Sequence, residues 1–580
     1  MSEEKYHWKS SKIREQIGVA SNQTAPTILL KNSMTMNPYC NQWVKAHIWI
    51  YEDRIVYAGE ELPEQTDGTE IIDCAGKWIV PGYIEPHAHP FQLYNPHTLA
   101  KYAAQFGTTT LINDNLSLIL QCDKKKALTF MKRFKELPVH TYWWARLDLQ
   151  TEVLDEDKIL APETMKKWIE NDCVIQGGEL TGWPRLLGGD DLMLYYIQEL
   201  KRNRKRVEGH FPGASERTLA KMKLFGADAD HEAMTGKEVM TRLMQGYYAA
   251  LRHSSIRPDL PVLLKGLQIA NLQSFDHLFF TTDGATPAYY EEGITNTLIK
   301  IALEHGVPAI DAYKMATYNI ARYYSIDHLL GSATPGRYAT LNILSDLDDP
   351  LPEAVLSKGI WLKKDGRDTG HFPEADLGEM GFRPLELSWE LSQDDLQFSM
   401  PIGVNMKNAV IMEPYRLSMD SSANELPPDC DECFLALIDR QGGWRINTVL
   451  KGFARNVPGL ASSYSTSGDI ILIGKSKQAM VTAFNRMKEL GGGIVLAAGD
   501  EILHEVPLHA NGGASLLEMP ELIQQVKKLD AVLRERGYAF DDPIYSLFFL
   551  SSTHLPFIRI TPRGIYDVKK KTVLFPSIMR

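Results

Sequence analysis

The sequence predicts an α/β protein built around a parallel barrel or a doubly wound sheet. Strand-then-helix units follow one another over about 250 residues after Pro90, as parallel sheets require. Short alternating strands precede these units, and the same strand rhythm returns after Ser332. At 580 residues the chain is too long for a single core, so we expect two to four domains.

The first part of the chain has the pattern of a small antiparallel β unit. Gly59, Gly68 and Gly76 punctuate short stretches of alternating apolar and polar residues. The strands that we expect here are Thr27–Leu30, Val44–Tyr51, Arg54–Ala58 and Glu70–Cys74.

The central units alternate apolar strands with amphipathic helices. Thr108–Asn113 is expected to be a strand, and the helical stretch Lys124–Glu136 follows it. The further strands that we expect, each followed by a helical pattern, are Val139–Arg146, Cys173–Gly177, Arg206–Gly209 and Leu278–Thr282.

Two more β-rich regions follow. Pro335–Leu344 and Ala354–Leu362 read as strands that return to complete the first β unit. A polar stretch rich in Pro and Asp, 365–395, reads as a linker. Beyond it we expect the strands Trp444–Leu450, Asp469–Gly474 and Gly493–Ala498 and the helix Lys477–Leu490. The expected domain limits are 1–80, 81–331, 332–364, 365–398 (linker) and 399–580.

Composition restricts the partners and the compartment. The net charge of −11 argues against nucleic acid or an anionic membrane as the main partner. No run of about 18 apolar residues occurs, and the N-terminal residues lack the apolar core of a secretion signal. Six cysteines, mostly far apart, are typical of a reduced cytoplasmic protein. We therefore expect a cytoplasmic protein that acts on a small molecule.

The most informative motif is PGYIEPHAHP (81–90), in which a strand ends in a turn that carries two histidines. His87 and His89 are two residues apart, and such residues on a strand point to the same side. They could present two imidazoles to one metal ion, although two ordinary turn histidines would show the same pattern. Further metal-ligand residues follow later strands in the same register: Glu179 in VIQGGEL, His210 in RVEGHFPG, His231 in GADADHE and Asp283 in LFFTTDG.

Four imidazoles and two carboxylates suit one or two divalent metals. Metal binding lowers the pKa of a coordinated water toward neutrality, and a neighbouring carboxylate can move the proton. We expect Asp283 to be that proton shuttle and Glu179 to lie between two metals. For Glu179 a surface helix-cap role fits the spacing equally well.

These segments together resemble the amidohydrolase superfamily, and specifically the bacterial adenine deaminase family. The resemblance is carried by PGYIEPHAHP, VEGHFPG, DADHE, TTDG and the later ATYN…PGRYATLNIL. GGEL places Glu179 where that family has a bridging carboxylate. LRHSSIRPDL (251–260) resembles its LR-x-[GS]-S segment, and NRMKELGGGIVL (485–496) resembles part of its extra C-terminal domain.

The resemblance implies a TIM-like hydrolase barrel, a β-sandwich built from both flanks and an appended α/β domain. It implies a metal-dependent conversion of adenine to hypoxanthine and ammonia at a site with two Mn²⁺, Fe²⁺ or Zn²⁺ ions, and a homodimer is compatible with it. The implied ligands are His87, His89, Glu179, His210, His231 and Asp283, with Asp283 and Glu179 catalytic. Arg252, Ser255 and Glu208 are the expected substrate-binding residues, and for Glu208 a role in holding the metal ligands is an equal alternative.

One departure from the family leaves the substrate open. Where the family carries a His-Asp-Ser-His-Asn run in its C-terminal domain, this chain has Ser465-Thr466-Ser467-Gly468-Asp469, without either histidine. Pocket groups decide which ring is held, so an amidohydrolase acting on another aminopurine, a pterin or a cyclic amide is the alternative. A binding protein without catalysis is a third reading, which the complete ligand set disfavours.

Overall fold

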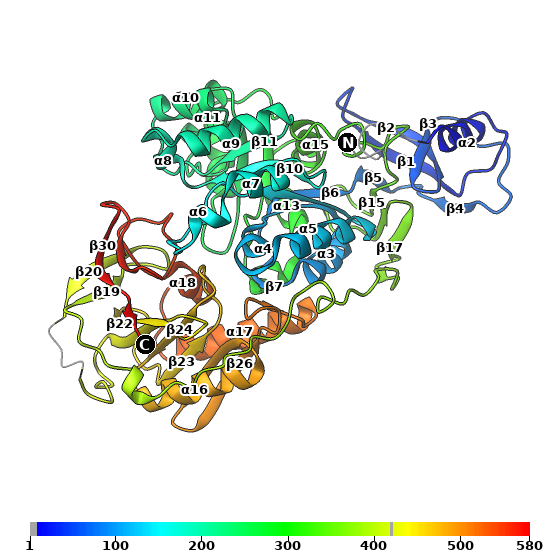
Figure 1. Cartoon of the computed structure of the whole chain (residues 1–580). Coiled ribbons are helices and arrows are strands. Elements are labelled where there is room, and N and C mark those ends of the chain that lie inside the picture. Colours follow the sequence, from blue (N-terminus) through cyan, green and yellow to red (C-terminus); the bar gives the residue numbers. More distant parts are fainter. Residues whose placement is uncertain (1–8, 418–421) are drawn as a thin grey trace.

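The computed structural model describes residues 9–417 and 422–580. Residues 1–8, the start of the N-terminal segment for which no secretion signal is expected, lie outside the described residues. Figure 1 shows a β-rich flank at one end, a barrel in the middle and a C-terminal domain at the other end.

Both flanks of the barrel sequence form one nine-stranded sheet. Strand β5 lies at the junction, with β1 parallel on one side and β15 antiparallel on the other. Isoleucines and leucines of both flanks share the core of this sheet. The prediction that the returning chain completes the first β unit is therefore confirmed. The strands are β1 (Ile28–Asn37), β2 (Gln42–Tyr51), β3 (Arg54–Gly59), β4 (Glu70–Asp73), β5 (Trp78–Pro81), β15 (Leu341–Leu344), β16 (Ala354–Ser357), β17 (Ile360–Lys364) and β18 (Arg367–Asp368).

The central region is an eight-stranded parallel barrel. Its strands neighbour one another in chain order, with no reversal, which excludes the doubly wound alternative. The strands are β6 (Tyr83–Ala88), β8 (Thr108–Asn113), β9 (His140–Ala145), β10 (Val174–Leu180), β11 (Arg206–Gly209), β12 (Ala229–Asp230), β13 (Tyr248–Arg252) and β14 (Leu278–Thr281). The main helices around them are α3 (Pro96–Gln105), α5 (Lys124–Arg133), α7 (Pro162–Ile169), α9 (Asp191–Arg202), α10 (Glu216–Phe225), α11 (Gly236–Met244), α12 (Leu260–Ile269) and α13 (Thr295–Glu304).

A buried glutamate joins the first and last barrel strands, which share no ladder of backbone hydrogen bonds. Glu85 of β6 accepts hydrogen bonds from the Thr281 hydroxyl (2.7 Å) and from the amide and hydroxyl of Thr282 (3.1 and 3.0 Å). It also accepts one from the His87 amide (3.1 Å). Burial raises the pKa of Glu85 to about 7. These bonds fix the end of β6 next to the end of β14, where His87 and Asp283 lie.

The C-terminal domain contains a second nine-stranded sheet, flanked by helices, and a small three-stranded sheet. Helix α16 begins at the Ser476 cap, whose hydroxyl accepts from the Ala479 amide, and it ends at Gly491 in the left-handed conformation. The elements are β19 (Ile402–Met406), β20 (Met412–Arg416), β21 (Glu432–Ile438), β22 (Trp444–Lys451), β23 (Gly459–Ser462), β24 (Ile470–Gly474), α16 (Lys477–Leu490), β25 (Gly493–Ala498), β26 (Glu501–Pro507), α17 (Met519–Glu535), α18 (Pro543–Phe549), β28 (Ile558–Thr561), β29 (Gly564–Asp567), β30 (Thr572–Pro576) and β31 (Ile578–Met579).

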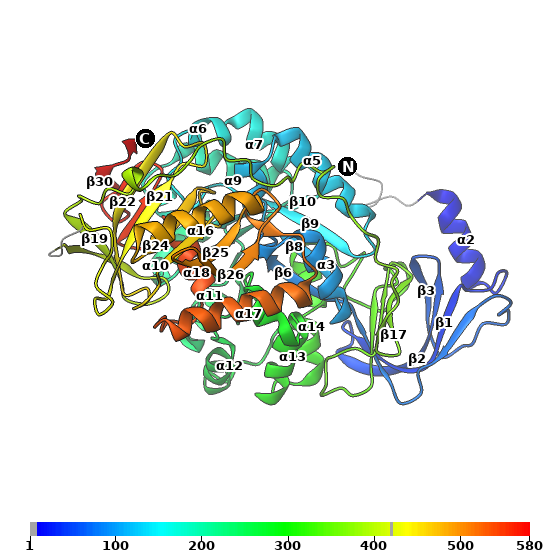
Figure 2. The same ribbon diagram turned by 90° about the horizontal axis from the view of Figure 1, so that it is seen from below.

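This domain is attached to the carboxyl end of the barrel. The short strand β27 (Ala514–Ser515) pairs in parallel with β7 (Leu93–Tyr94), which follows the His-x-His turn. The Asn95 side chain donates to the Ser515 carbonyl (2.8 Å). Helix α17, labelled in Figure 2, packs against the 3₁₀ helix η2 (Pro287–Glu292) that follows β14. The domain therefore contacts the loops in which the candidate site residues lie.

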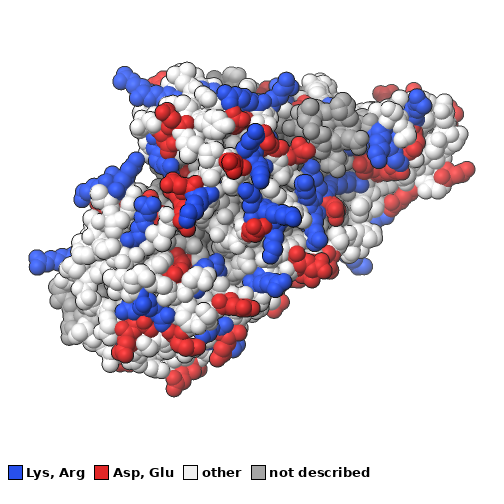
Figure 3. Space-filling view, viewed as in Figure 1, with Lys and Arg blue, Asp and Glu red and all other residues white. Residues whose placement is uncertain are grey.

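Basic and acidic side chains are interspersed over the face shown in Figure 3. In the part of the chain that the structure describes, no helix combines the length and the apolar character needed to cross a membrane.

Candidate metal centre and active site

The six predicted ligands all lie at the carboxyl ends of barrel strands. His87 is the penultimate residue of strand β6 and His89 directly follows this strand, while Glu179 is the penultimate residue of β10. His210 follows β11, His231 follows β12 and Asp283 lies two residues beyond β14. In a parallel barrel these ends form one rim, so residues almost 200 positions apart in the sequence become neighbours.

The ligand atoms converge into three overlapping groups. Each group has ligand atoms within 4.8 Å of one another: His87, His89 and Glu179; His87, His231 and Asp283; and Glu179, His210 and His231. Glu179 thus belongs to two groups, and its Oε1 lies 2.6 Å from His210 Nδ1 and 3.4 Å from His231 Nε2. The Asp283 Oδ1 atom lies 3.1 Å from His87 Nε2 and 3.2 Å from His89 Nε2.

The donor set fits a divalent metal ion. His87 is fully buried, and neither of its ring nitrogens forms a hydrogen bond with a described residue, although Asp283 Oδ1 approaches its Nε2 atom at 3.1 Å. Ligands that share one ion at about 2.1 Å lie about 3.0 to 3.4 Å apart, so such close but unbonded pairs are the spacing that a common ion produces. Neutral imidazoles and carboxylates also match the donor types that Mn²⁺, Fe²⁺ and Zn²⁺ accept.

Two buried carboxylates, Glu208 and Asp114, contact the Nδ1 atoms of the candidate histidine ligands and hold the imidazoles in place. Glu208 of β11 lies between His87 and His231, with its oxygens 3.1 and 3.2 Å from their Nδ1 atoms. The side chain of Gln176 donates to Glu208 (2.8 Å). Burial, the largest single effect, acts to raise the pKa of Glu208, but the contacts with the two imidazoles together outweigh it and lower the pKa to about 2. Because Glu208 is 1% exposed and does not line the cavity described below, its geometry matches the ligand-holding alternative.

Asp114 holds the imidazole of His89 in the same way. Its Oδ2 atom lies 2.9 Å from His89 Nδ1, and Arg146 donates to both of its oxygens (2.8 and 2.7 Å). Arg146 is fully buried and also lies 3.0 Å from Glu179 Oε2. One guanidinium group thus holds a ligand and a ligand-supporting carboxylate in place.

The charges around the site leave an excess of negative charge. Arg252 contacts Glu232 (2.7 Å) and Asp283 (2.8 Å), and Arg257 donates to Glu232 (2.9 Å). Burial acts to raise the pKa of Asp283, but the Arg252 charge and the neighbouring imidazoles hold it well below the usual range. Five carboxylates therefore face three guanidinium groups, which leaves two negative charges if the imidazoles are neutral, and this excess suits a bound cation. The carboxylates are Asp114, Glu179, Glu208, Glu232 and Asp283, and the guanidinium groups are Arg146, Arg252 and Arg257.

A cavity of about 860 Å³ opens above these residues. His89, Glu179, His210, Arg252 and Asp283 line it from the barrel, while His87 and His231 are fully buried beneath it. The C-terminal domain supplies the opposite wall, with Tyr464, Ser465, Thr466, Tyr545, Phe548, Phe549 and His554. Burial lowers the pKa of His554 to about 3, so its imidazole is neutral. The barrel rim with the candidate ligands therefore lies between two domains.

A buried aspartate fastens this wall to the barrel. Asp542 caps α18 by accepting from the Ile544 amide (3.0 Å), and it accepts from the hydroxyls of Ser255 (2.9 Å) and Thr286 (2.7 Å) in the barrel loops. Tyr545 donates to the Gly284 carbonyl (2.5 Å), directly beside Asp283. Ser255, expected to bind substrate, therefore contacts the C-terminal domain and does not line the cavity.

Sequence reasoning missed several residues that complete the site. Asp114 directly follows the predicted strand Thr108–Asn113 and could have been found by the same strand-end rule, but no histidine accompanies it. Arg146 lies at the end of another predicted strand, as one basic residue among many. His554 lies in a loop more than 250 residues from the nearest barrel ligand, and no sequence pattern linked it to the site.

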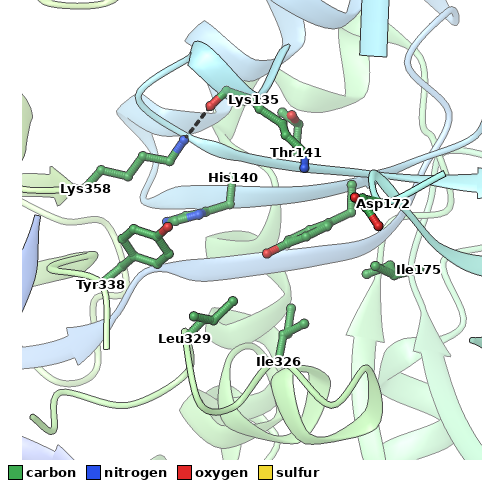
Figure 4. Close-up of a pocket in the computed structure, with 10 residues that line it drawn as sticks. Lys135, His140, Thr141, Asp172, Ile175, Ile326, Leu329, Tyr338 and Lys358 are labelled. Atoms are coloured by element: carbon green, nitrogen blue, oxygen red, sulfur yellow. Dashed lines mark hydrogen bonds between the residues drawn. The ribbon is translucent and has the colours of Figure 1, made fainter. Parts of the chain in front are cut away.

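A second cavity, of about 60 Å³, lies near the opposite end of the barrel (Figure 4). His140, the first residue of β9, contacts the Thr340 hydroxyl (3.0 Å) there, and Lys358 donates to the Lys135 carbonyl (3.1 Å). Burial and nearby cations hold the pKa of His140 well below its usual range. Asp172 is the one acidic residue in its lining, so this cavity lacks the ligand set of the first.

Two family models match the chain, and they cover different regions. The amidohydrolase family matches residues 78–362, which include all six candidate ligands. The adenine deaminase C-terminal domain matches residues 410–572, which include the wall of the cavity.

Relatives match along the whole chain. A protein of Bacillus subtilis strain 168 named "Putative adenine deaminase YerA" is 59% identical over 580 residues, which cover all of both chains. A similarly named protein of Bacillus cereus is 52% identical and covers 100% of this chain and 98% of its own. The adenine deaminase of Bacillus velezensis is 26% identical over 96% of this chain and 98% of its own. The chain belongs to the adenine deaminase family of the amidohydrolase superfamily.

Proposed function

We propose that this protein is a metal-dependent aminohydrolase that converts adenine to hypoxanthine and ammonia. The proposal is supported above all by the convergence of four imidazoles and two carboxylates beneath a cavity walled by the C-terminal domain. The family and the names of the relatives point to the same reaction. In this proposal His87, His89, Glu179, His210, His231 and Asp283 hold one or two divalent metal ions.

A metal ion bound to this set would supply a water of lowered pKa, and the surrounding residues would move the proton and hold the substrate. Asp283 lies at the boundary between ligands and cavity, with Oδ1 toward the two histidines and Oδ2 toward Arg252. Because Arg252 favours the ionised carboxylate, Asp283 is ready to accept a proton at Oδ1 and to deliver it to the departing amino group. Protonation turns that group into ammonia, a neutral leaving group. As the bond between C6 and this nitrogen breaks, the oxygen of the added water stays on C6 and its second proton moves to the ring, so that adenine and water give hypoxanthine and ammonia.

The substrate ring would lie against the aromatic wall. Tyr464 and Phe548 are stacked with centroids 5.1 Å apart, and Tyr545 and Phe549 are stacked at 5.0 Å. Such faces suit a planar heterocycle, and their contact with the barrel rim excludes bulk water from the reacting atoms.

The first test is ammonia release from adenine at millimolar concentration by protein reconstituted with Mn²⁺. We expect turnover that is lost on chelation and restored by Mn²⁺. Turnover insensitive to chelation would contradict the metal requirement, and no ammonia from adenine in the loaded protein would refute the proposed reaction.

A bulkier aminopurine or a pterin is the second candidate substrate. The cavity of about 860 Å³ lies near the upper end of the range for drug-sized ligands, about 300 to 1,000 Å³, and exceeds what a free purine needs. A panel of aminopurines, pterins and cyclic amides, assayed in parallel, separates the two candidates by which compound is turned over with the higher kcat/KM. Opening of a cyclic amide is recognised separately, because it consumes substrate without releasing ammonia. Manganese as the native metal, a role in purine metabolism, a cytoplasmic location and a homodimer belong to the proposal as expectations from the sequence.

A further inference from the structure

One histidine of the C-terminal domain lies in the active-site cavity without a partner. His554 lines the cavity, and its ring centroid lies 5.6 Å from that of the candidate ligand His210, at an interplanar angle of 90°. Its Nδ1 atom is enclosed and has no hydrogen-bond partner. Among the residues that the structure describes, neither nitrogen of this imidazole forms a hydrogen bond. An enclosed polar group of this kind is costly unless something else satisfies it.

The loop that carries His554 is held firmly against the barrel. The Thr553 amide donates to the Gln150 carbonyl (2.7 Å), and the Thr151 hydroxyl donates to the Ser551 carbonyl (2.8 Å). The Gln150 side chain in turn donates to Glu179 Oε2 (3.0 Å). Two hydrogen bonds between the domains therefore fix the position of His554 relative to the metal ligands.

The surroundings of His554 match a planar, polar ligand. Phe549 packs edge-on against its ring, with centroids 5.8 Å apart at 81°, and Phe549 belongs to the stacked aromatic pair of the cavity wall. A heterocycle placed against this wall and above His210 would bring its ring nitrogens or exocyclic groups to the imidazole. No protein group among the described residues forms that hydrogen bond with the imidazole in its place.

We propose that His554 is a substrate-contacting residue, which hydrogen-bonds the polar edge of the heterocycle and helps to select it. This inference rests on the proposed function. It assigns to the C-terminal domain a direct part in substrate recognition, in addition to closing the cavity. It also explains why the loop 551–555 is tied to the same barrel residue that contacts Glu179.

The test compares His554→Leu and His554→Gln with the wild type, all loaded with Mn²⁺ and assayed with adenine. The control is His509→Gln, which changes a histidine of the same domain that does not line the cavity. We measure KM and kcat for ammonia release, the dissociation constant of hypoxanthine, metal content and melting temperature.

Loss of one hydrogen bond to a buried ligand predicts that His554→Leu raises KM and the hypoxanthine dissociation constant about tenfold. We expect a smaller change in kcat, unchanged metal content and melting temperature, and partial rescue by His554→Gln, which retains a donor and an acceptor. The control should behave as wild type.

A failure of this inference and a failure of the proposed function give different results. Wild-type KM and hypoxanthine affinity in His554→Leu would overturn the inference and leave the proposed function standing. A loss of metal or of melting temperature in both variants, without a specific rise in KM, would assign His554 a structural role and also overturn it. A wild-type protein that neither deaminates adenine nor binds hypoxanthine would refute the proposed function, and the inference with it.

Discussion

Substituting Glu208 by Gln should weaken metal binding without removing any metal ligand. The Glu208 carboxylate faces two imidazole Nδ1 atoms, of His87 at 3.1 Å and of His231 at 3.2 Å. Glutamine keeps the shape but offers one oxygen and one NH₂ group. One of the two imidazoles therefore meets a donor where it had an acceptor, and its orientation is no longer fixed.

The magnitude follows from the hydrogen bond between Glu208 and His231 Nδ1 at 3.2 Å, because the contact of Glu208 with His87 Nδ1 is not a hydrogen bond. A hydrogen bond to a charged group contributes about 1.5 to 3 kcal/mol, which corresponds to a factor of about 10 to 150 in an equilibrium constant. Glu208 is 1% exposed, so solvent cannot replace the bond. We expect metal affinity to fall by about 10- to 100-fold, in line with other residues that support metal-bound histidines.

The assay is a titration of metal-free protein with Mn²⁺ against a competing chelator, with Glu304→Gln as the matched control. Glu304 is an exposed residue at the end of α13, so its substitution by Gln makes the same chemical change away from the site. Wild-type metal affinity in Glu208→Gln would refute the reasoning. A raised KM for adenine with unchanged metal affinity would instead assign Glu208 the substrate-binding role.

Three further predictions concern the rim and the C-terminal domain. Asp283→Asn should lower ammonia release below about 1% of wild type while at least one metal stays bound by elemental analysis, because an amide cannot accept the proton; full activity would contradict the shuttle. Gly284→Ala should lower the free energy of unfolding by about 1 to 3 kcal/mol more than Gly370→Ala in denaturant titrations. Both glycines have positive φ, but of the two only Gly284 has a neighbour, His89, at 2.4 to 2.7 Å from the position of an added Cβ. Equal losses in the two variants would show that this clash does not affect stability. Asp469 has a pKa raised by burial to about 6, above the unfolded value of about 3.9, so its favourable contribution is complete below pH 4 and is lost as the pH rises through 6. Asp469→Asn should therefore stabilise the protein by up to about 3 kcal/mol at pH 7.5 but not at pH 4, and equal effects at both pH values would contradict the shift.

Periodicity predicted the long regular elements well. The helix Lys477–Leu490 and the strands Thr108–Asn113 and Gly493–Ala498 were predicted with the bounds that the structure shows. Three barrel strands were not among the expected strands. The motif that was expected to be a turn with two histidines contains strand β6, β12 has only two residues, and β13 follows a turn at Gly246 that could have indicated it. The domain limits inferred from composition stay predictions, which limited proteolysis would test.

The candidate ligands could be predicted because of a property of the fold. In a parallel barrel, residues that end successive strands share one rim, so local patterns such as His-x-His and Thr-Thr-Asp-Gly translate directly into neighbours in space. For residues that support the ligands, a position at a strand end does not indicate which side chain each one contacts. Glu208 has a neighbour in the sequence, His210, yet its carboxylate faces His87 and His231.

The sequence by itself determined the class of fold, the six candidate ligands and the return of the chain to the first sheet, because each depends on local pattern and on the order of elements. Only the tertiary structure decided which residues surround the candidate ligands. Asp542, Tyr545 and His554 reach the barrel rim because the C-terminal domain is fastened over it by buried hydrogen bonds between residues hundreds of positions apart. Such contacts depend on how two separately folded surfaces match in shape and polarity, and no spacing along one chain records that match.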